Sequence, residues 1–583
     1  MAVSTGPAPA LTPAEIRWTP DGPCSDRFGE GYFGAADGLA EADHVFIEGN
    51  GLRERFAAVR AGEVFVLGEL GFGTGTNALA ALSAWACRGH DRGHLWIVSV
   101  EAYPLGRADL RRALDAAATT DAAGAAEAAR RLVAAYPDPL PGQTTVRLGG
   151  DATLTLLFGE AASALDAAGF AADAWMLDGF SPRTNPGMWR DEVFTLVAAR
   201  SRAGATAATF TVAGTVRRGL ERAGFAWRRR PGFGRKRECL AAQRPGTPEL
   251  AAAPRVAILG GGIAGAACAA QLLRLGASPV LFDPAPASGA SGNPGGLVTP
   301  RLQAADDAHA RFYRDAYLFA GRFYAEACPD ALTLCGADVA VAETRLQKIL
   351  SLGFWPSGEL TARPGGLHAP NALVIRPAEA VAALLDGIEV RRVAPVSLAE
   401  LIADTAFDAV VVATGAGTLR LLADDALRGA LTARRGQVDR FAGPPPPRIL
   451  SGDGYAAPLG EEVLAGATYG PAPPDDAVQP SSPDSEANAA TASQLMNRAP
   501  GPSLGARASV RLAARDRHPV AGFHEGAYLL TALGSRGLVT APLLAADAAS
   551  ALLGAPRLLP HDQLNVLQPD RFARRANRLQ TGS

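Results

Sequence analysis

Three glycines alternate with other residues at Gly71, Gly73 and Gly75, directly after an apolar run, and Glu69 precedes them by two residues. Glycine lets the backbone turn tightly and approach a ligand closely, and the helix expected to follow directs its first N–H groups at that ligand. The G-x-G-x-G spacing differs from the G-x-G-x-x-G spacing of dinucleotide-binding turns. The pattern predicts a site for S-adenosylmethionine (SAM), whose amino-acid end would lie against the loop.

Acidic residues follow three further strand-like runs in this half of the chain. Glu101 ends one run, where its carboxylate is expected to accept hydrogen bonds from both ribose hydroxyls of SAM. Asp151 follows a strand expected over 144–149 and is predicted to bind the adenine amine. Asp178 follows the run 174–177. Ligands of parallel α/β sheets bind at the carboxyl ends of the strands, so Asp178 is predicted to face the transferred methyl group. The alternative role for Asp178 is a helix N-cap.

A second glycine-rich turn, with a different spacing, contains Gly260, Gly262 and Gly265. It matches G-x-G-x-x-G, in which a pyrophosphate lies at a helix N-terminus. Asp283 stands 18 residues past the last of these glycines, close to the separation expected for an acid that binds a ribose. The motif predicts a dinucleotide cofactor, and by itself it leaves NAD and FAD open.

Both turns lie where strand-like and helix-like runs alternate, which indicates parallel α/β sheets. Residues 1–244 are predicted to form a Rossmann-like methyltransferase domain. A Pro/Ala-rich linker at 245–254 leads to a second nucleotide-binding domain over 255–583. The apolar run 409–412 is expected to return to the sheet of that second domain. The residues in between would then form an inserted α+β substrate domain.

Two segments carry further local expectations. Residues 154–168 are predicted to be helical. Residues 471–505 are rich in Pro, Ser, Asp and Ala with few large apolar side chains, so they are predicted to form a mobile loop on the inserted domain.

Charge is distributed unevenly along the chain. The net charge of the 583 residues is −2, which gives no overall indication of nucleic-acid binding. Nine Arg or Lys residues, however, lie between Arg217 and Arg237 against a single acid, Glu221. Such a patch is typical of a surface that binds a polyanion, and the alternative is a solvated helix face. Residues 225–243 are expected to form a terminal hairpin that carries the end of this patch.

Several classes of protein are not indicated. No apolar run reaches the roughly 18 residues that suggest a membrane span. The start of the chain lacks the basic and apolar parts of a secretory signal. The six cysteines are scattered and have no metal-ligand spacing. These features predict a cytoplasmic protein without a membrane segment or a metal site.

Longer blocks of sequence carry a family resemblance. Asp178–Trp189, Phe210–Phe225 and Gly232–Glu238 resemble the methyltransferase half of the MnmC family of bifunctional tRNA wobble-uridine modification enzymes. Gly31–Phe33 and His44–Asn50 do so as well. The resemblance covers nearly the whole first half of the chain.

The second half resembles the flavoproteins of the D-amino-acid oxidase and glycine oxidase superfamily. The residues that carry this likeness are Ala290–Asn293, Gly295–Val298, Ala413–Gly415 and Leu533–Pro542. The resemblance favours FAD over NAD. It implies that further flavin-binding positions are Ser291, Asn293, Gly415, Gly534 and Gly537.

Four blocks of the second half match the oxidase half of the MnmC family: Arg435–Val438, Ser451–Tyr455, Arg511–Asp516 and again Leu533–Pro542. The resemblance implies that Arg511 binds the substrate carboxylate, with a surface or interdomain salt bridge as the alternative. Tyr455 is expected to line the same pocket, and a buried tyrosine that holds a loop is an equally good interpretation.

The MnmC resemblance implies two reactions on the wobble uridine (position 34) of tRNA. FAD-dependent oxidation removes the carboxymethyl group from 5-carboxymethylaminomethyl-(2-thio)uridine, releases glyoxylate and leaves 5-aminomethyl-(2-thio)uridine. Oxygen is expected to reoxidise the flavin. SAM-dependent N-methylation then gives 5-methylaminomethyl-(2-thio)uridine.

The same resemblance suggests roles in the methyl transfer. Asp178 is expected to orient the amine and accept its proton, because an alkylammonium has no lone pair to attack with. Tyr32 and Phe180 are expected to stack the wobble base. The predicted contacts to the anticodon stem of tRNA are made by Arg235, Lys236 and Arg237.

Two other classes of function stay open. One is an amine oxidase for small molecules fused to a methyltransferase, and the basic patch argues against it. The other is an RNA-binding protein whose catalytic sites have decayed. The intact glycine motifs, together with Glu101, Asp178 and Arg511, argue against decay.

Overall fold

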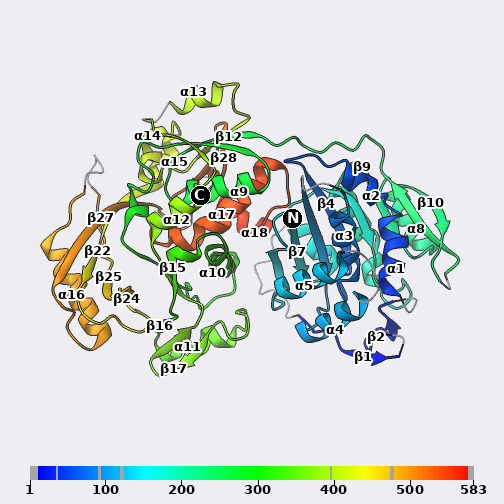
Figure 1. Ribbon diagram of the computed structural model, residues 1–583, viewed down its shortest axis with the longest axis horizontal. Coiled ribbons are helices and arrows are strands. Elements are labelled where there is room, and N and C mark those ends of the chain that lie inside the picture. Colours follow the sequence, from blue (N-terminus) through cyan, green and yellow to red (C-terminus); the bar gives the residue numbers. More distant parts are fainter. Residues whose placement is uncertain are drawn as a thin grey trace, which may run out of the picture. The chain divides into compact units, whose positions relative to one another are not determined.

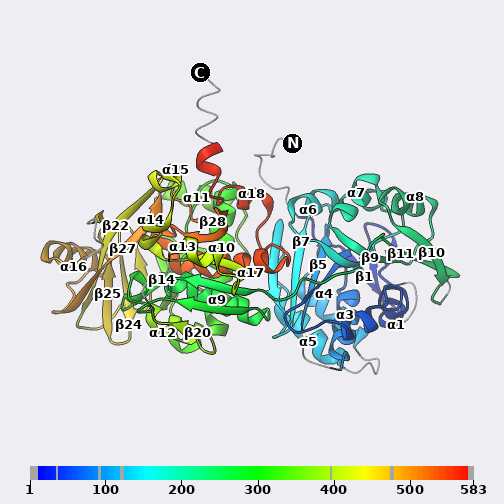
Figure 2. The same ribbon diagram turned by 90° about the horizontal axis from the view of Figure 1, so that it is seen from above.

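The computed structural model describes residues 11–20, 22–33, 37–89, 93–118, 124–234, 236–393, 397–472 and 478–574. The chain forms two compact units (Figures 1 and 2). The first unit contains Ala8–Ala253 together with Leu553–His561, and the second contains Pro254–Leu552 and residues from Asp562 onward. Leu553–His561, which we expected in the second domain, thus packs with the first unit.

The first unit is built on an eight-stranded sheet within the described residues, in the order β10-β11-β9-β8-β4-β5-β7-β6. Its centre is parallel, and every residue of the four neighbouring strands β8, β4, β5 and β7 is buried, as expected where both faces of a sheet are covered. The strands are β4 (Val64–Leu70), β5 (His94–Glu101), β6 (Gly142–Arg147), β7 (Ala152–Phe158), β8 (Ala172–Leu177), β9 (Ser201–Thr209), β10 (Ala226–Pro231) and β11 (Glu238–Gln243).

Helices cover both faces of this sheet. Figure 2 shows α3, α4 and α5 on one face and α6, α7 and α8 on the other. Their bounds are Thr76–Ala86, Arg107–Ala117, Ala125–Ala135, Ala161–Ala167, Asp191–Ala199 and Gly214–Arg222, in chain order. A small antiparallel sheet precedes the main sheet and consists of β1 (Ile16–Thr19), β2 (Gly22–Ser25) and β3 (Glu30–Gly31). The short helices α1 (Gly38–Ala42) and α2 (Leu52–Ala57) follow it. The predicted Rossmann-like fold of this half is confirmed.

The prediction of a helix over 154–168 is wrong in its first half. The strand β7 occupies Ala152–Phe158, and only α6 is helical. On β7, Thr153 and Thr155 alternate with leucines, and their hydroxyls bond His94 and Trp96 of the neighbouring strand. This two-residue alternation with β-branched threonine is the strand signal in the segment.

The second unit contains a six-stranded sheet among its described residues, in the order β20-β13-β12-β21-β29-β28. The strands are β12 (Arg255–Leu259), β13 (Ser278–Phe282), β20 (Glu389–Arg391), β21 (Ala409–Val412), β28 (Val520–His524) and β29 (Ala527–Thr531). The helix α9 (Ile263–Arg274) connects β12 to its parallel neighbour β13. The predicted return of 409–412 to this sheet is confirmed, because β21 pairs with β12 in parallel.

The inserted part of the second unit contains a larger sheet in the order β17-β18-β16-β23-β24-β25-β22-β26, with β27 paired to β22. The strands are β16 (Ala337–Ala340), β17 (Thr361–Arg363), β18 (Gly366–Ala369), β22 (Leu431–Phe441), β23 (Ile449–Ser451), β24 (Tyr455–Leu459), β25 (Glu462–Gly466), β26 (Gly470–Pro471) and β27 (Ser503–Ala514). The expected insertion into the second domain therefore contains a sheet of its own.

The segment 471–505 is not a loop as predicted. It contains α16 (Ser482–Met496), which lies against β22, β24 and β25 (Figure 1). Ser481 caps the helix by accepting a hydrogen bond from the Asp484 N–H, and Ala492 packs into a core with Phe441. The many alanines of this segment, which we took as a sign of a loop, are good helix formers.

One described helix, Gly534–Leu553, is long and apolar enough to be compared with a membrane span, and 72% of its apolar 18-residue window is buried. A helix at the core of a folded unit meets the same criteria. Within the described ranges, no group of three or more His, Cys, Asp or Glu side chains could hold a metal ion.

Candidate active sites

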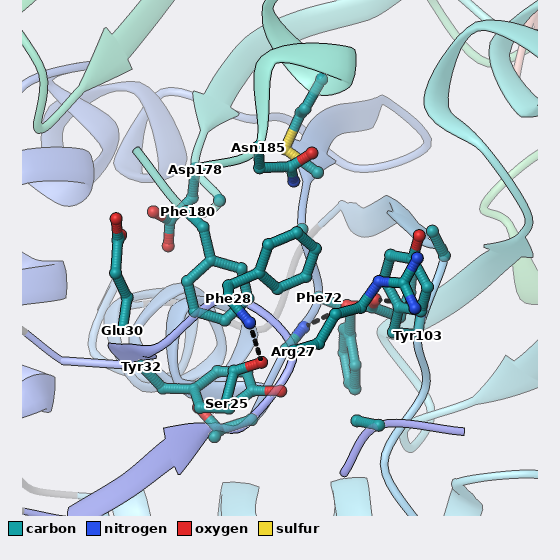
Figure 3. A pocket seen from close by; sticks show the side chains of 18 of the residues that line it. Ser25, Arg27, Phe28, Glu30, Tyr32, Phe72, Tyr103, Asp178, Phe180 and Asn185 are labelled. Carbon is teal, nitrogen blue, oxygen red and sulfur yellow. Dashed lines mark hydrogen bonds between the residues drawn. The ribbon is translucent and has the colours of Figure 1, made fainter. Parts of the chain in front are cut away.

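A cavity of about 630 Å³ opens at the carboxyl ends of β4, β5, β7 and β8 (Figure 3). The loop Gly71–Gly75 forms one wall, and all three predicted glycines have positive φ angles of 80°, 51° and 74°. A side chain at Gly71 would also lie 3.3 Å from the Gly179 Cα. Glycine is required here both for the left-handed backbone and for the close approach of two loops.

Glu101 lines the cavity and Glu69 does not. The Glu101 carboxylate accepts hydrogen bonds of 2.7 Å from the Gly73 and Tyr103 N–H groups, and burial raises its pKa to about 7. Glu69 lies fully buried within β4, where the Ser99 hydroxyl donates to it over 2.5 Å and burial raises its pKa to about 8. Glu101 can therefore contact a ligand in the cavity, whereas Glu69 lies inside the sheet, just before the glycine loop.

Asp178 lines the same cavity. Asn77 on α3 donates a 2.7 Å hydrogen bond from Nδ2 to Asp178 Oδ2, and burial raises the pKa of Asp178 to about 6. Its alternative role as an N-cap is not found, because the next two helices begin after Asn185 and Arg190, several residues beyond Asp178. Near neutral pH the carboxylate is therefore ionised but close to its titration point.

Aromatic side chains line the cavity beside Asp178 (Figure 3). The predicted pair Tyr32 and Phe180 meets edge to face at 5.2 Å between ring centroids. Phe28 stacks on Phe180 at 4.5 Å, and Tyr103 meets Phe28 at 5.6 Å. Sequence reasoning missed Phe28 and Tyr103. The position of Tyr103 just after the acid that ends β5 is the signal that could have found it.

The prediction that Asp151 binds adenine is wrong. Asp151 precedes β7 and so lies at the amino edge of the sheet, opposite the cavity, where it accepts 2.9 Å hydrogen bonds from Trp85 Nε1 and Arg88 Nη2. The error follows from taking 144–149 as the third parallel strand. That strand is β7, and the residues beyond its carboxyl end that line the cavity are Gly159, Glu160 and Ala161.

The three basic residues predicted to contact tRNA do not share one environment in the structure. Arg235 lies outside the described residues, and Arg237 is exposed. Lys236 lines the methyltransferase cavity, where its ammonium is 2.9 Å from the Glu41 carboxylate and 4.1 Å from the centre of the Phe210 ring. Its position fits a wall of the cavity better than a phosphate contact.

In the second unit, the second glycine turn follows β12 at the carboxyl edge of the sheet. Gly260 has φ 104°, and a Cβ there would lie 2.5 Å from the Ala413 carbonyl oxygen. A Cβ on Gly265 would collide with the Gly260 carbonyl. At Gly262 a Cβ would meet only the Ser291 hydroxyl, at 3.3 Å. Gly260 and Gly265 are thus needed for the fold, while Gly262 leaves open space at the N-terminus of α9.

The other predicted flavin residues gather at the same edge. Gly415 follows β21, and Gly534 and Gly537 follow β29 at the start of α17 (Gly537–Leu553). Since β12, β21 and β29 are parallel neighbours, their carboxyl ends meet. The remaining predicted contacts are polar: the Asp283 carboxylate accepts from the Gly261 N–H over 2.6 Å, the Ser291 hydroxyl accepts from the Ile263 N–H over 2.9 Å, and Asn293 Oδ1 accepts from Arg507 over 2.8 Å.

Arg511 and Tyr455 lie on the inserted sheet, on β27 and β24. The Arg511 guanidinium lies across Gly436, where a Cβ would be 2.6 Å from Nη1, and reaches Tyr469, whose ring centre is 5.2 Å from its Cζ. Nη1 is buried without a hydrogen-bond partner among the described residues. Burial raises the pKa of Tyr455 to about 12, so its hydroxyl stays protonated.

Comparison with known proteins identifies both halves. Residues 123–245 match a family described as S-adenosyl-L-methionine-dependent methyltransferase, and residues 255–551 match one described as FAD dependent oxidoreductase. The bifunctional tRNA 5-methylaminomethyl-2-thiouridine biosynthesis protein MnmC of Caulobacter vibrioides is 41% identical, over 96% of this chain and 98% of its own. The chain belongs to the MnmC family. The MnmC protein of Maricaulis maris is 38% identical over 97% of each chain.

Two solved structures were also similar. Glycine oxidase from Geobacillus kaustophilus is 20% identical, with a TM-score of 0.42 over 51% of this chain and 95% of that one. MnmC2 from Aquifex aeolicus is 22% identical, with a TM-score of 0.32 over 42% of this chain and 75% of that one.

Membership of the MnmC family confirms the predicted order of domains and both cofactors. A SAM-dependent methyltransferase is followed by an FAD-dependent oxidoreductase, so FAD rather than NAD is the partner of the second glycine turn. The pair of activities is that of bifunctional tRNA wobble-uridine modification.

Proposed function

We propose that this protein acts twice on the wobble uridine of tRNA, removing a carboxymethyl group in its second unit and adding a methyl group in its first. The observation that carries the proposal is that one chain of the MnmC family holds two glycine-loop sites, each at the carboxyl edge of its own parallel sheet. Methyl label from SAM should therefore enter tRNA bearing carboxymethylaminomethyluridine only while the oxidase works.

Six cysteines without disulfides agree with a cytoplasmic location.

Oxidation requires the carboxylate of the substrate to be held beside the flavin. FAD, when bound, would supply the oxidising chemistry at the α-carbon of the glycine-like arm. Arg511 would hold the carboxylate, because its buried Nη1 lacks the partner that an anionic ligand supplies. The nitrogen loses its proton to solvent, and water hydrolyses the substrate imine to the primary amine and glyoxylate.

Methyl transfer requires a neutral amine in line with the methyl group of SAM. Asp178 is placed to accept the hydrogen bond and then the proton of the amine, while its own carboxylate is fixed by Asn77. Phe180 and Tyr32 beside it offer aromatic faces and edges to the uracil ring, and together with Phe28 they keep water away from the nitrogen.

Replacing Arg511 with Lys should reduce the kcat/KM of oxidation roughly 10- to 100-fold, because an ammonium keeps the charge but cannot make the planar two-bond contact with a carboxylate. Flavin content should be unchanged. Glyoxylate release from carboxymethylaminomethylated tRNA measures the effect. Arg515→Lys, just beyond the same strand, is the matched control and should behave as wild type. Normal oxidation in Arg511→Lys would assign the carboxylate to another residue, Arg536 first.

The affinity for SAM should fall as the pH drops below about 7. Burial raises the pKa of Glu101 to about 7, and only its carboxylate form accepts both ribose hydroxyls, so each pH unit below that value should cost up to about tenfold in Kd. Calorimetry between pH 5.5 and 8 measures this. Glu101→Gln should bind weakly and lose the pH dependence, whereas Glu69→Gln should retain it. A pH-independent Kd for the wild type would remove Glu101 from the ribose site.

The structure changes which basic residues are candidates for tRNA binding. Three arginines of the patch are paired with carboxylates in the ion pairs Arg222–Asp191, Arg229–Glu238 and Arg230–Glu48. Arg218, Arg228 and Arg237 are exposed and have no acidic partner within the described residues. These three are left to contact phosphates.

Changing Arg218, Arg228 and Arg237 together to Ala should flatten the salt dependence of tRNA binding. Each lost phosphate contact takes about 0.7 to 0.9 from the slope of log affinity against log salt. Fluorescence titration at several salt concentrations gives the slope. Lys236→Ala should leave the slope unchanged, because Lys236 faces the cavity. An unchanged slope in the triple variant would move the tRNA surface elsewhere.

A further inference from the structure

Tyr469 is an exposed aromatic residue beside the predicted carboxylate-binding arginine. Its relative exposure is 63%, while Tyr455 near it is largely buried. Its hydroxyl makes no hydrogen bond within the described part of the chain. A tyrosine that serves packing is normally covered, with its hydroxyl paired. The Tyr469 ring is therefore available to contact another molecule and is not part of a core.

The register of the inserted sheet explains why Tyr469 and Arg511 meet. On one side of β22, Arg434 is opposite Arg511 of β27, and on the other side Arg435 is opposite Gly470 of β26. Tyr469 directly precedes that glycine. Gly436 has no side chain, so the Arg511 guanidinium crosses β22 there and ends 5.2 Å from the Tyr469 ring centre. The Tyr469 ring and the unpaired Arg511 Nη1 thus lie close together.

We infer that Tyr469 is the platform on which the uracil base of the substrate nucleotide stacks in the oxidase site. The inference rests on the proposed oxidation of the wobble uridine. A short flexible arm joins the uracil ring to the carboxylate, so a base on the exposed ring would bring the carboxylate toward Arg511. Unpaired bases of RNA are commonly held on aromatic faces in this way, without regard to hydrogen-bonding pattern.

Buried neighbours support this role. Arg536 donates hydrogen bonds of 3.0 Å from Nη1 to both the carbonyl and the hydroxyl of Thr299, and it lies close enough to Tyr469 to interact with it electrostatically. The Arg511 guanidinium faces one side of the ring, and most of the residue stays exposed. A ligand with an aromatic part and an anionic part fits this arrangement, whereas free glycine would use only the anionic half.

The experiment compares Tyr469→Ala, Tyr469→Phe and wild type with two probes. The first probe is tRNA bearing carboxymethylaminomethyluridine, assayed by glyoxylate release. The second is glycolate, a carboxylate without a base, whose Kd is read from its perturbation of the flavin spectrum. Phe523→Ala is the matched control, because Phe523 is 62% exposed in the same unit and packs edge to face on Tyr528 instead.

Tyr469→Ala should raise the KM for tRNA oxidation roughly 5- to 150-fold, the range measured for one base–aromatic stack, and leave the glycolate Kd unchanged. Tyr469→Phe and Phe523→Ala should match wild type. An unchanged KM for tRNA in Tyr469→Ala would overturn the inference. So would a parallel loss of glycolate binding, since the ring would then only hold Arg511. Absence of glyoxylate with wild-type enzyme would instead contradict the proposed function itself.

Discussion

Gly262→Val is expected to yield a protein that retains no FAD and releases no glyoxylate from tRNA. We expect the pyrophosphate of the cofactor to lie against the N-terminus of α9, where a branched side chain at Gly262 would fill the space. Among the glycines of this turn, Gly262 is the one whose replacement should disturb the fold least. Gly262 has a φ of −78°, and a Cβ there meets only Ser291 Oγ, at 3.3 Å.

Flavin absorbance per mole of purified protein measures the effect of Gly262→Val directly. Methylation of tRNA that already carries aminomethyluridine should continue, since the first unit has its own core. Gly321→Val on α10 (Ala308–Ala327), where a Cβ meets nothing within 4 Å, is the matched control and should remain yellow. A stoichiometric flavin content in Gly262→Val would refute the position of the pyrophosphate.

Asp178→Asn should slow methyl transfer roughly 10²-fold or more, the usual contribution of one acid–base group. Asparagine has the same shape and can still accept the hydrogen bond from Asn77, so SAM binding should be nearly unchanged. Glyoxylate release should continue and aminomethyluridine should accumulate. Single-turnover transfer of labelled methyl to aminomethylated tRNA is the measurement.

Asp151→Asn is the control for this prediction, because Asp151 is an acid of the same unit that lies at the opposite edge of the sheet. It should methylate at the wild-type rate. The wild-type rate should also fall as the pH drops through about 6, where Asp178 becomes protonated, and Asp178→Asn should lose that step. Full methyl transfer by Asp178→Asn would exclude this carboxylate as the proton acceptor.

The sequence was most informative where a local pattern alone decides the structure. Both glycine turns lie at strand–helix junctions, and the conformations of Gly71 and Gly260 are ones that only glycine adopts without strain. The run 409–412 could be assigned to a distant sheet because its apolar residues suit a buried parallel strand. The resemblance to the MnmC family then fixed the order of the two activities.

The errors came from features that depend on neighbours in space. Taking 154–168 as one helix moved the third strand forward and put Asp151 at the wrong edge. The direction of Lys236 follows from its pairing with Glu41, which is 195 residues away and cannot be read from a run of basic residues. Phe28 lines the cavity and Tyr469 lies beside Arg511 only because folding brings together residues that are far apart in the sequence.

The most direct test of a sequential two-site reaction is mass spectrometry of wobble nucleosides after incubating the FAD-loaded protein with tRNA that carries 5-carboxymethylaminomethyluridine. Without SAM, 5-aminomethyluridine should accumulate with an equal amount of glyoxylate. With SAM, 5-methylaminomethyluridine should replace it. Unchanged 5-carboxymethylaminomethyluridine under both conditions, or methylation without prior loss of the carboxymethyl group, would contradict this order of reactions.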